Sequence, residues 1–278
     1  MKVYDCFPFF NELDLLELRL NELDDVVDRF VLVEATKTFQ KQDKPLHFME
    51  NKKRFERFLD KIVHVVVDEY PGFFKRFRRP TPWDYSNHQK DQVIMGLQDC
   101  EPGDKVIISD LDEIPSRHSV AKHISSPGVV VFQQRLSNYF LNCVAVNSPD
   151  EPHLIKKGGF VFWRGSVMLN YRDFVSFKKT RLLRNKQSEH IIQAEEAGWH
   201  FSFLGDIETI QYKLKNWEHA NEAHYSQAYL DDPDSLRKLI EKGGDLFGRD
   251  FEYQFIDIDE SFPEHIVRNL HAYAKYIR

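Results

Sequence analysis

The sequence of 278 residues has few cysteines, no long apolar run and no excess of positive charge. Cys6, Cys100 and Cys143 are odd in number and form no C-x-x-C pair, which disfavours a disulfide framework and a structural zinc site. No segment approaches the run of about 18 apolar residues that a membrane-spanning helix needs, and the N-terminal residues lack the regions of a signal peptide. We therefore expect a cytoplasmic chain with no membrane span.

The charge balance also excludes a class of partner. Lys and Arg number 38 and Asp and Glu 44, so the formal net charge is −6 and no global positive field attracts nucleic acid. Hydrophobic residues make up 42% and charged residues 29%, which is ordinary for a globular protein. The composition predicts a folded protein that does not bind nucleic acid.

Apolar periodicity predicts the elements of the first half. Leucines and Val27 recur at helical spacing over 13–27, and apolar runs over 30–34, 61–67 and 105–109 are typical of buried strands. Helix-like stretches over 51–59 and 85–97 separate these strands. This alternation predicts an α/β fold with a mainly parallel central sheet and helices on both faces. Beyond Pro115 we expect closely spaced antiparallel strands and then C-terminal helices.

The strongest local feature is a cluster of carboxylates after the strand at 105–109. Asp110, Asp112 and Glu113 follow that strand, and ligands of open α/β sheets bind at the carboxyl ends of the strands. Two aspartates two residues apart can approach one hard cation, Mn²⁺ or Mg²⁺, on a nucleotide diphosphate. The alternative is a solvated acidic loop in which Asp112 caps a helix begun at Pro115.

Two chemistries place a D-x-D motif after such a strand. In haloacid-dehalogenase-like phosphatases the motif usually opens the chain and is followed by Thr or Val, whereas here it is followed by Glu113. In nucleotide-sugar transferases of the GT-A type the motif follows a nucleotide-binding half, which fits this chain. We therefore expect a single GT-A-like domain over 1–278, with a nucleotide-binding half over 1–115 and an acceptor half over 116–278.

Four motifs occur in order along nearly the whole chain: Tyr4–Leu20, Phe30–Thr36, Ser109–Pro115 and Gly198–Ser202. Together they resemble glycosyltransferase family 17. The resemblance implies an inverting, Mn²⁺-dependent transferase that moves N-acetylglucosamine from UDP-GlcNAc to a mannose-type saccharide acceptor. Two alternatives remain open: a transferase that uses another nucleotide sugar, and a non-catalytic carbohydrate-binding protein on the same fold.

The resemblance also implies site residues. By similarity to other GT-A enzymes, His200 completes the metal shell of Asp110 and Asp112, with His219 in reserve, and Lys213 meets the diphosphate. Gln89 and Lys90 stand where the family has a Gln-Arg pair. His200 can equally be a structural strand residue.

Glu34 and Thr36 end a strand and either bind the base and ribose or cap a helix or turn. Trp83 and Trp217 have ring faces suited to sugars, although isolated tryptophans more often pack in a core.

Inverting transfer requires a carboxylate that accepts the proton of the acceptor hydroxyl. Five residues qualify by type, and spacing does not choose among them: Glu113, Asp173, Glu189, Glu195 and Glu196. We name Glu113 because it belongs to the shared motif, although it can equally orient the metal ligands.

The acceptor is expected to be a cytoplasmic saccharide intermediate. Two segments are expected to adapt the cleft to that acceptor, namely Lys75–Arg79 and the Ala220–Asn221 pair, where relatives tend toward Gln-Glu.

Overall fold

The structure is a computed structural model, and it describes residues 1–70, 79–220 and 229–278. Twelve strands form one sheet in the described residues. The strands are β1 (Val3–Phe9), β2 (Arg29–Ala35), β3 (Ile62–Val67), β4 (Lys105–Ile108), β5 (Glu113–Pro115), β6 (Val129–Asn138), β7 (Cys143–Asn147), β8 (Leu154–Lys157), β9 (Phe160–Asn170), β10 (Ile191–Ala194), β11 (Gly198–Ser202) and β12 (Glu252–Phe255).

Helices connect these strands. The α-helices are α1 (Leu13–Leu23), α2 (His47–Glu50), α3 (Pro82–Asp91), α4 (Arg117–His123), α5 (Phe177–Leu182), α6 (Ile207–Asn216), α8 (Pro233–Glu241), α9 (Glu264–Arg268) and α10 (Leu270–Tyr273). The 3₁₀ helices are η1 (Lys52–Phe58), η2 (Gln92–Gly96), η3 (Tyr171–Asp173), η4 (Leu183–Asn185) and η5 (Ala274–Tyr276).

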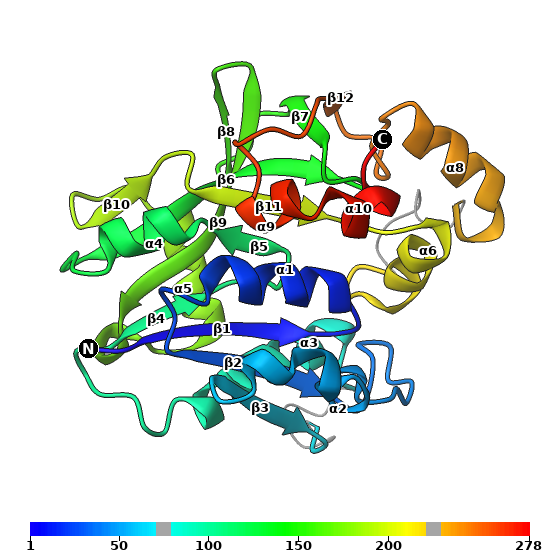
Figure 1. Ribbon diagram of the computed structural model, residues 1–278. Coiled ribbons are helices and arrows are strands. Elements are labelled where there is room, and N and C mark those ends of the chain that lie inside the picture. The colour runs from blue at the N-terminus through cyan, green and yellow to red at the C-terminus, as the bar shows by residue number, and fades with distance from the viewer. Residues whose placement is uncertain (71–78, 221–228) are drawn as a thin grey trace.

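The sheet runs in the order β12-β7-β6-β9-β4-β1-β2-β3 (Figure 1). Strands β3, β2, β1 and β4 are mutually parallel, whereas β9, β6, β7 and β12 continue the sheet with antiparallel pairs. The α/β class is therefore confirmed. The parallel part belongs to the first half of the chain and the antiparallel part to the second, so the sheet as a whole is mixed.

The first strand, β1, is absent from the sequence prediction, whose first element is the helix over 13–27. Strand β1 lies at the centre of the parallel region, with Cys6 opposite Val31 of β2 and Ile108 of β4. Asp5 and Pro8 interrupt its apolar pattern. Pro8 is tolerated because the pairing with β4 ends at Cys6, so no ladder bond is lost on that side.

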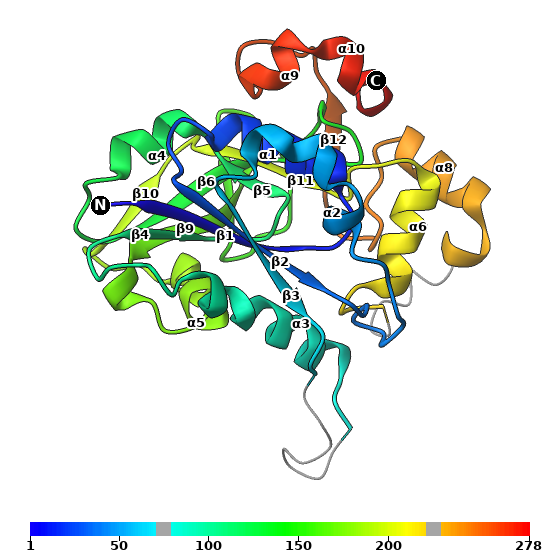
Figure 2. The same ribbon diagram turned by 60° about the horizontal axis from the view of Figure 1, so that its bottom comes forward.

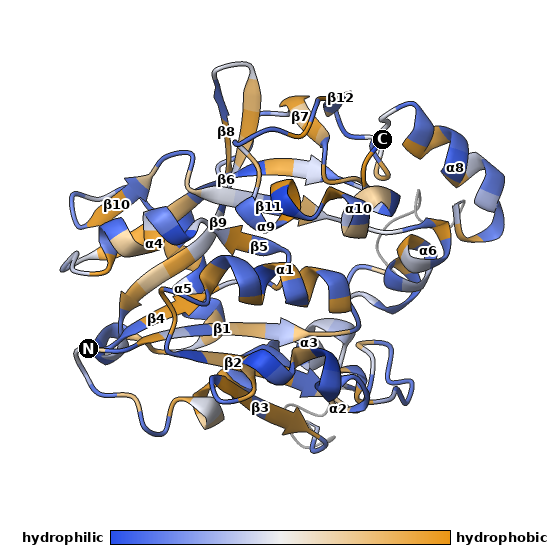
Figure 3. Ribbon diagram, in the orientation of Figure 1, coloured by the Kyte–Doolittle hydropathy of each residue, from blue (hydrophilic) through white to orange (hydrophobic). Residues whose placement is uncertain are grey.

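Helices cover both faces of the sheet, as expected. Figure 2 shows α1 and α4 on one face and α3 and α5 on the other. Alternate residues of β1 serve the two cores, because Phe7 and Phe9 pack with the leucines of α1 while Tyr4 and Cys6 pack on the opposite side. In Figure 3 hydrophobic residues predominate in β9, whereas hydrophilic positions interrupt β1.

The structure can be searched for membrane-spanning helices and for disulfides. In the ranges that the structure describes, no helix is long and apolar enough to cross a membrane. Cys6, Cys100 and Cys143 are all buried and free, which agrees with the absence of a disulfide framework.

Candidate active site

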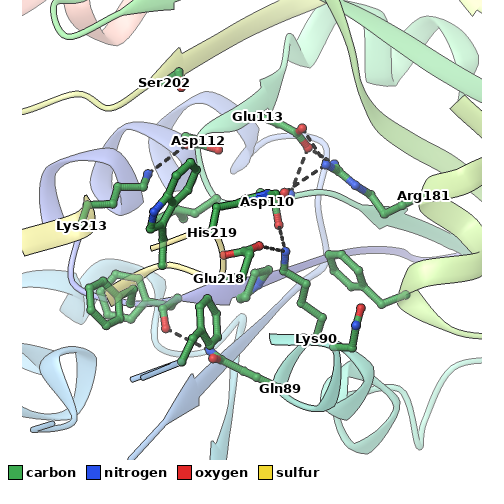
Figure 4. A pocket seen from close by; sticks show the side chains of 18 of the residues that line it. Gln89, Lys90, Asp110, Asp112, Glu113, Arg181, Ser202, Lys213, Glu218 and His219 are labelled. Carbon is green, nitrogen blue, oxygen red and sulfur yellow. Dashed lines mark hydrogen bonds and ion pairs between the residues drawn. The ribbon is translucent and has the colours of Figure 1, made fainter. Parts of the chain in front are cut away.

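A cleft of about 510 Å³ opens at the carboxyl ends of β1 and β4. Its walls come from segments distant in sequence: the residues that follow these two strands, α3, α5, β11 and α6. We call it the main cleft. Figure 4 shows its charged side chains pointing toward one another from these different elements. The D-x-D motif forms the floor, as expected from the rule that ligands bind beyond strand ends.

Arg19 of α1 holds the backbone of this floor. Its guanidinium is fully buried, forms a bidentate pair with Asp5 at 2.6 and 2.7 Å, and donates to the Ser109 hydroxyl at 2.6 Å. The remaining donor, Nη1, reaches three carbonyl oxygens of the motif, those of Asp110, Leu111 and Glu113, at 2.8–3.1 Å. A planar fork is needed to make such a set of bonds. Arg19 therefore fixes the loop that carries the carboxylates.

Asp110 is enclosed by cations. Lys90 of α3 lies 3.1 Å from its Oδ1 and Arg181 of α5 lies 3.0 Å from its Oδ2. Burial alone would raise the pKa of Asp110, but Lys90 and Arg181 outweigh that effect and hold it well below its usual range. The carboxylate is therefore ionised and already neutralised by protein groups.

Glu113 is only 1% exposed and its carboxylate is fully engaged. Trp163 donates its indole N–H to Oε1 at 2.7 Å, the Asp110 amide donates to Oε2 at 3.0 Å, and Arg181 forms a bidentate pair with both oxygens. Burial would raise the pKa of Glu113, but Arg181 outweighs it and the pKa is lowered. This geometry is that of an orienting group.

Asp112 faces the other side of the cleft, toward β11 and α6. Its Oδ1 lies 3.7 Å from Nε2 of His200, and its Oδ2 lies 3.3 Å from Nζ of Lys213. Burial lowers the pKa of His200, despite the opposing effect of Asp112, so the imidazole is neutral at neutral pH. The side chains of Asp112, His200 and Lys213 thus lie together on one side of the main cleft.

Strand pairing brings His200 to the motif. Strand β11 lies antiparallel to β5 with His200 opposite Glu113, and the Phe201 amide donates to the Asp112 carbonyl at 3.0 Å. Gly198 permits this approach: its φ is +142°, and a Cβ there would lie 2.2 Å from the Ile114 carbonyl oxygen. This close approach explains why the Gly198–Ser202 motif begins with glycine.

Arg181 and Arg184 also line the main cleft, and the sequence analysis did not identify either as a site residue. Arg184 of η4 lies 3.5 Å from Glu113 and its guanidinium stands 4.9 Å from the Trp163 ring. Burial and the neighbouring Arg181 lower the pKa of Arg184 to about 10. The signal available in the sequence was a run of basic residues over 178–184, which by itself is typical of a solvated helix face.

Gln89 and Lys90 lie in the main cleft, but Glu34 and Thr36 do not line it. The buried Glu34 carboxylate accepts from the Phe48 amide at 3.1 Å and pairs with His64 and Lys44. Thr36 contacts Tyr70 through its hydroxyl at 3.1 Å. Strand β1 lies between β2 and β4 in the sheet, so the end of β2 is one strand further from the motif, and the nucleotide role of Glu34 and Thr36 stays a prediction.

Most candidates for the base also lie elsewhere. Asp173, Glu189, Glu195 and Glu196 do not line the main cleft, and the last two pair with Lys157. Two carboxylates that the sequence analysis did not consider do line it, Glu12 and Glu218.

Glu218 is loosely held. Lys90 lies 3.5 Å from its Oε1, and the Ser86 hydroxyl donates to the same oxygen at 3.4 Å. Glu12, by contrast, accepts from the Asn11 amide at 3.1 Å and pairs with Lys213 at 3.4 Å.

The remaining predictions concern His219 and the two expected acceptor segments. His219 lines the main cleft and packs its ring against Trp83 and Trp217 at 4.6 and 4.8 Å. Residues 75–78 and Asn221 lie outside the described residues, so the expected acceptor segments have no structural account. Within the described ranges, no three His, Cys, Asp or Glu side chains are already arranged to hold a metal ion.

Comparison with known proteins places the chain in a family. Glycosyltransferase family 17 matches residues 1–268. The β-1,4-mannosyl-glycoprotein 4-β-N-acetylglucosaminyltransferases of Rattus norvegicus and Homo sapiens are each 26% identical over 289 aligned residues, covering 96% of this chain and 53% of theirs. The chain therefore spans about half the length of these relatives.

Solved structures are similar only at a distance. HddC from Yersinia pseudotuberculosis has a TM-score of 0.38 at 12% identity and covers 70% of this chain and 90% of its own. Glucosyl-3-phosphoglycerate synthase of M. tuberculosis has a TM-score of 0.37 at 9% identity, over 96% and 92%. These scores carry no argument about the site. The match over residues 1–268 decides the assignment: the chain belongs to glycosyltransferase family 17.

Proposed function

We propose that this chain transfers N-acetylglucosamine from UDP-GlcNAc to a mannose-type saccharide, with inversion at the anomeric carbon and dependence on a divalent cation. The observation that carries the proposal is the main cleft, where the D-x-D carboxylates, His200 and the cations of α5 and α6 converge. The curated relatives are named as transferases of N-acetylglucosamine to a β-1,4-mannosyl glycoprotein, which supports the choice of sugars.

The charges of the main cleft suit a diphosphate accompanied by a metal ion. Its lining contains five cations, Lys90, Lys178, Arg181, Arg184 and Lys213, and five carboxylates, Glu12, Asp110, Asp112, Glu113 and Glu218. The protein groups alone therefore balance, whereas a sugar diphosphate adds a negative charge on each phosphate. A divalent cation restores neutrality. In this proposal both halves of the chain, 1–115 and 116–278, contribute to the donor site, because the lining residues come from both.

Asp112 and His200 fit the cation better than Asp110 does. Their oxygen and nitrogen lie 3.7 Å apart and both belong to ligand types that Mn²⁺ accepts, whereas Asp110 is already paired with Lys90 and Arg181. In this proposal Asp112 and His200 would hold the ion. The ion supplies stabilisation of the leaving diphosphate.

Other residues of the main cleft have the remaining roles in binding and catalysis. Lys213 and Arg184 contact the diphosphate, and Glu113 positions Arg181 and the motif. The acceptor oxygen forms a bond to the anomeric carbon as the bond from that carbon to the phosphate oxygen breaks, and UDP leaves with the electron pair. We assign the acceptor proton to Glu218, because it lines the cleft and its carboxylate has only two long contacts.

Substitution of the metal ligand tests the donor site. Asp112→Asn is expected to abolish Mn²⁺-dependent binding of UDP in calorimetry and to leave the thermal midpoint nearly unchanged, because the group lost faces the cleft. Asp173→Asn, at an exposed carboxylate outside the cleft, is the matched control and is expected to bind UDP like the wild type. Equal UDP affinity in Asp112→Asn and wild type with Mn²⁺ present would overturn the metal assignment.

Substitution of the base tests the catalytic step separately. Glu218→Gln is expected to lower kcat by roughly 10²–10⁴-fold with UDP affinity retained, as for loss of a general base. Glu189→Gln, outside the cleft, is expected to keep full activity. A kcat for Glu218→Gln within a factor of three of wild type would remove Glu218 from this role.

Donor choice is tested by a screen of nucleotide sugars with and without Mn²⁺. Metal-dependent transfer from UDP-GlcNAc to a β-mannoside is the expected result. Transfer from another nucleotide sugar alone, or saccharide binding without any transfer, would replace this function with one of its alternatives.

A further inference from the structure

A second cavity adjoins the main cleft. It has a volume of about 440 Å³, within the range of small-molecule sites, and we call it the side cavity. It is lined by Leu136, Asn138, Trp163, His200, Ser202, Phe203, Trp217, His219, Phe247, Arg249, Phe251 and Tyr253. Half of these residues also line the main cleft, so the two spaces meet along β11 and the residues after α6. His200 lies on this boundary.

The walls of the side cavity are aromatic. Trp217 stacks on Phe247 with ring centroids 5.3 Å apart, and Phe251 stacks on Tyr253 at 5.7 Å. Flat ring faces of this kind contact the C–H faces of pyranose rings.

The polar groups of the side cavity are paired or neutral. Arg249 lies 2.8 Å from Asp245, so its charge is compensated, and its guanidinium stands between 4.7 and 4.9 Å from the rings of Phe251 and Phe247. No carboxylate lines the side cavity in the described part of the chain. A neutral ligand therefore suits it better than a phosphate.

Two lining residues have unmet hydrogen-bonding capacity. Oδ1 of Asn138 and Nε1 of Trp217 are buried and have no hydrogen-bond partner among the described residues. A buried polar atom left without a partner is destabilising, so native structures usually satisfy it. The acceptor atom of Asn138 and the donor atom of Trp217 match in kind the hydroxyl groups of a saccharide, which both donate and accept.

We propose that the side cavity binds the saccharide acceptor, which meets the donor at the His200 boundary. The proposal rests on the proposed transferase function for the identity of the ligand as an acceptor. It places acceptor recognition on residues of the second half of the chain that are distinct from Lys213 and Arg184, the groups assigned to the diphosphate.

The test compares two phenylalanines on or next to β12. Phe251→Leu removes a ring face of the side cavity, whereas Phe255→Leu, the matched control, alters a ring that packs on Phe140 and lines neither cavity. Phe251→Leu is expected to raise the KM for a β-mannosyl-chitobiose acceptor roughly three- to tenfold, with the KM for UDP-GlcNAc and the UDP affinity unchanged. Phe255→Leu is expected to leave all three unchanged. The retained UDP affinity shows that each variant is folded.

A binding measurement without donor separates this proposal from the transferase function. Saturation-transfer NMR with β-mannosyl-chitobiose is expected to show binding to the wild type, weakened in Phe251→Leu and not in Phe255→Leu. That pattern supports a saccharide site even if no transfer from UDP-GlcNAc is found, in which case only the transferase function fails. Absence of binding and an unchanged acceptor KM overturn the side-cavity proposal. A change in donor KM alone assigns the cavity to the donor sugar and overturns it too.

Discussion

At the residue scale, Arg19 shows how one side chain can organise a site that it does not enter. It pairs with the buried Asp5 and donates to three carbonyls of the D-x-D loop. Arg19 therefore links α1, β1 and the end of β4 through hydrogen bonds. A buried charge of this kind is tolerated because its partners satisfy its donors, and removal of one partner leaves the other uncompensated.

Arg19→Met is therefore expected to destabilise the protein by about 3–5 kcal/mol, because Asp5 is left buried and unpaired. Urea unfolding measures this loss. The control Arg57→Met removes an exposed pair with Asp24 and is expected to cost at most about 1 kcal/mol. Equal losses in the two variants would show that the buried network contributes no more than a surface pair.

At the element scale, α1 connects the two ends of the chain. Asp14 in its first turn accepts a hydrogen bond from Tyr276 of η5, pairs with Lys275 at 2.8 Å, and contacts Arg54 of η1. Burial would raise the pKa of Asp14, but hydrogen bonds from Lys275, Tyr276 and Arg54 outweigh it and lower the pKa to about 2. One carboxylate thus joins the C-terminal segment to the first helix.

This lowered pKa predicts a pH dependence of stability. The folded value lies below the unfolded value of 3.8, so the stabilisation is complete above about pH 4 and is lost as the pH falls toward 2. Over that range the wild type is expected to lose about 1–2 kcal/mol more than Asp14→Asn, allowing for screening of a partly exposed carboxylate. Denaturant unfolding at a series of pH values measures it, with Asp25→Asn, an exposed carboxylate, as the control. Parallel profiles for wild type and Asp14→Asn would contradict the prediction.

At the scale of the whole molecule, a single sheet joins the two halves of the chain. Strand β4 of the first half pairs along its length with β9 of the second, and the main cleft takes residues from both. We therefore expect residues 1–278 to behave as a single domain and to unfold in one cooperative transition, since neither half can lose its sheet without disturbing the other.

Coincident transitions by tryptophan fluorescence and far-UV circular dichroism would support this prediction, and separated midpoints would contradict it.

Ligands that bind only the folded state stabilise it. UDP with Mn²⁺ at 100 times its Kd is therefore expected to add about 2.7 kcal/mol to the free energy of unfolding and to raise Tm by roughly 5–10 °C. ADP at the same concentration is the control for base recognition.

The sequence alone was enough to predict the alternation of elements, the carboxylates after β4 and the family. The apolar runs of β2 and β4 are strong because these strands are buried on both faces, and β3 at the sheet edge is also apolar although mostly half-buried. The D-x-D motif needs only a strand before it. The sequence was not enough for β1, whose Asp5 is acceptable in a buried strand only because Arg19 reaches it from α1.

Tertiary structure alone decided which polar residues share the main cleft. Glu34 carries the same carboxyl group as Glu218, yet the first is buried against Lys44 and His64 while the second lines the cleft beside Lys90. Arg181 and Arg184 read as part of an ordinary basic run until α5 is packed beside β4 and β9. The physical reason is that residue type sets what a group can bind, whereas only the packing of distant elements sets its burial, its partners and its charge environment.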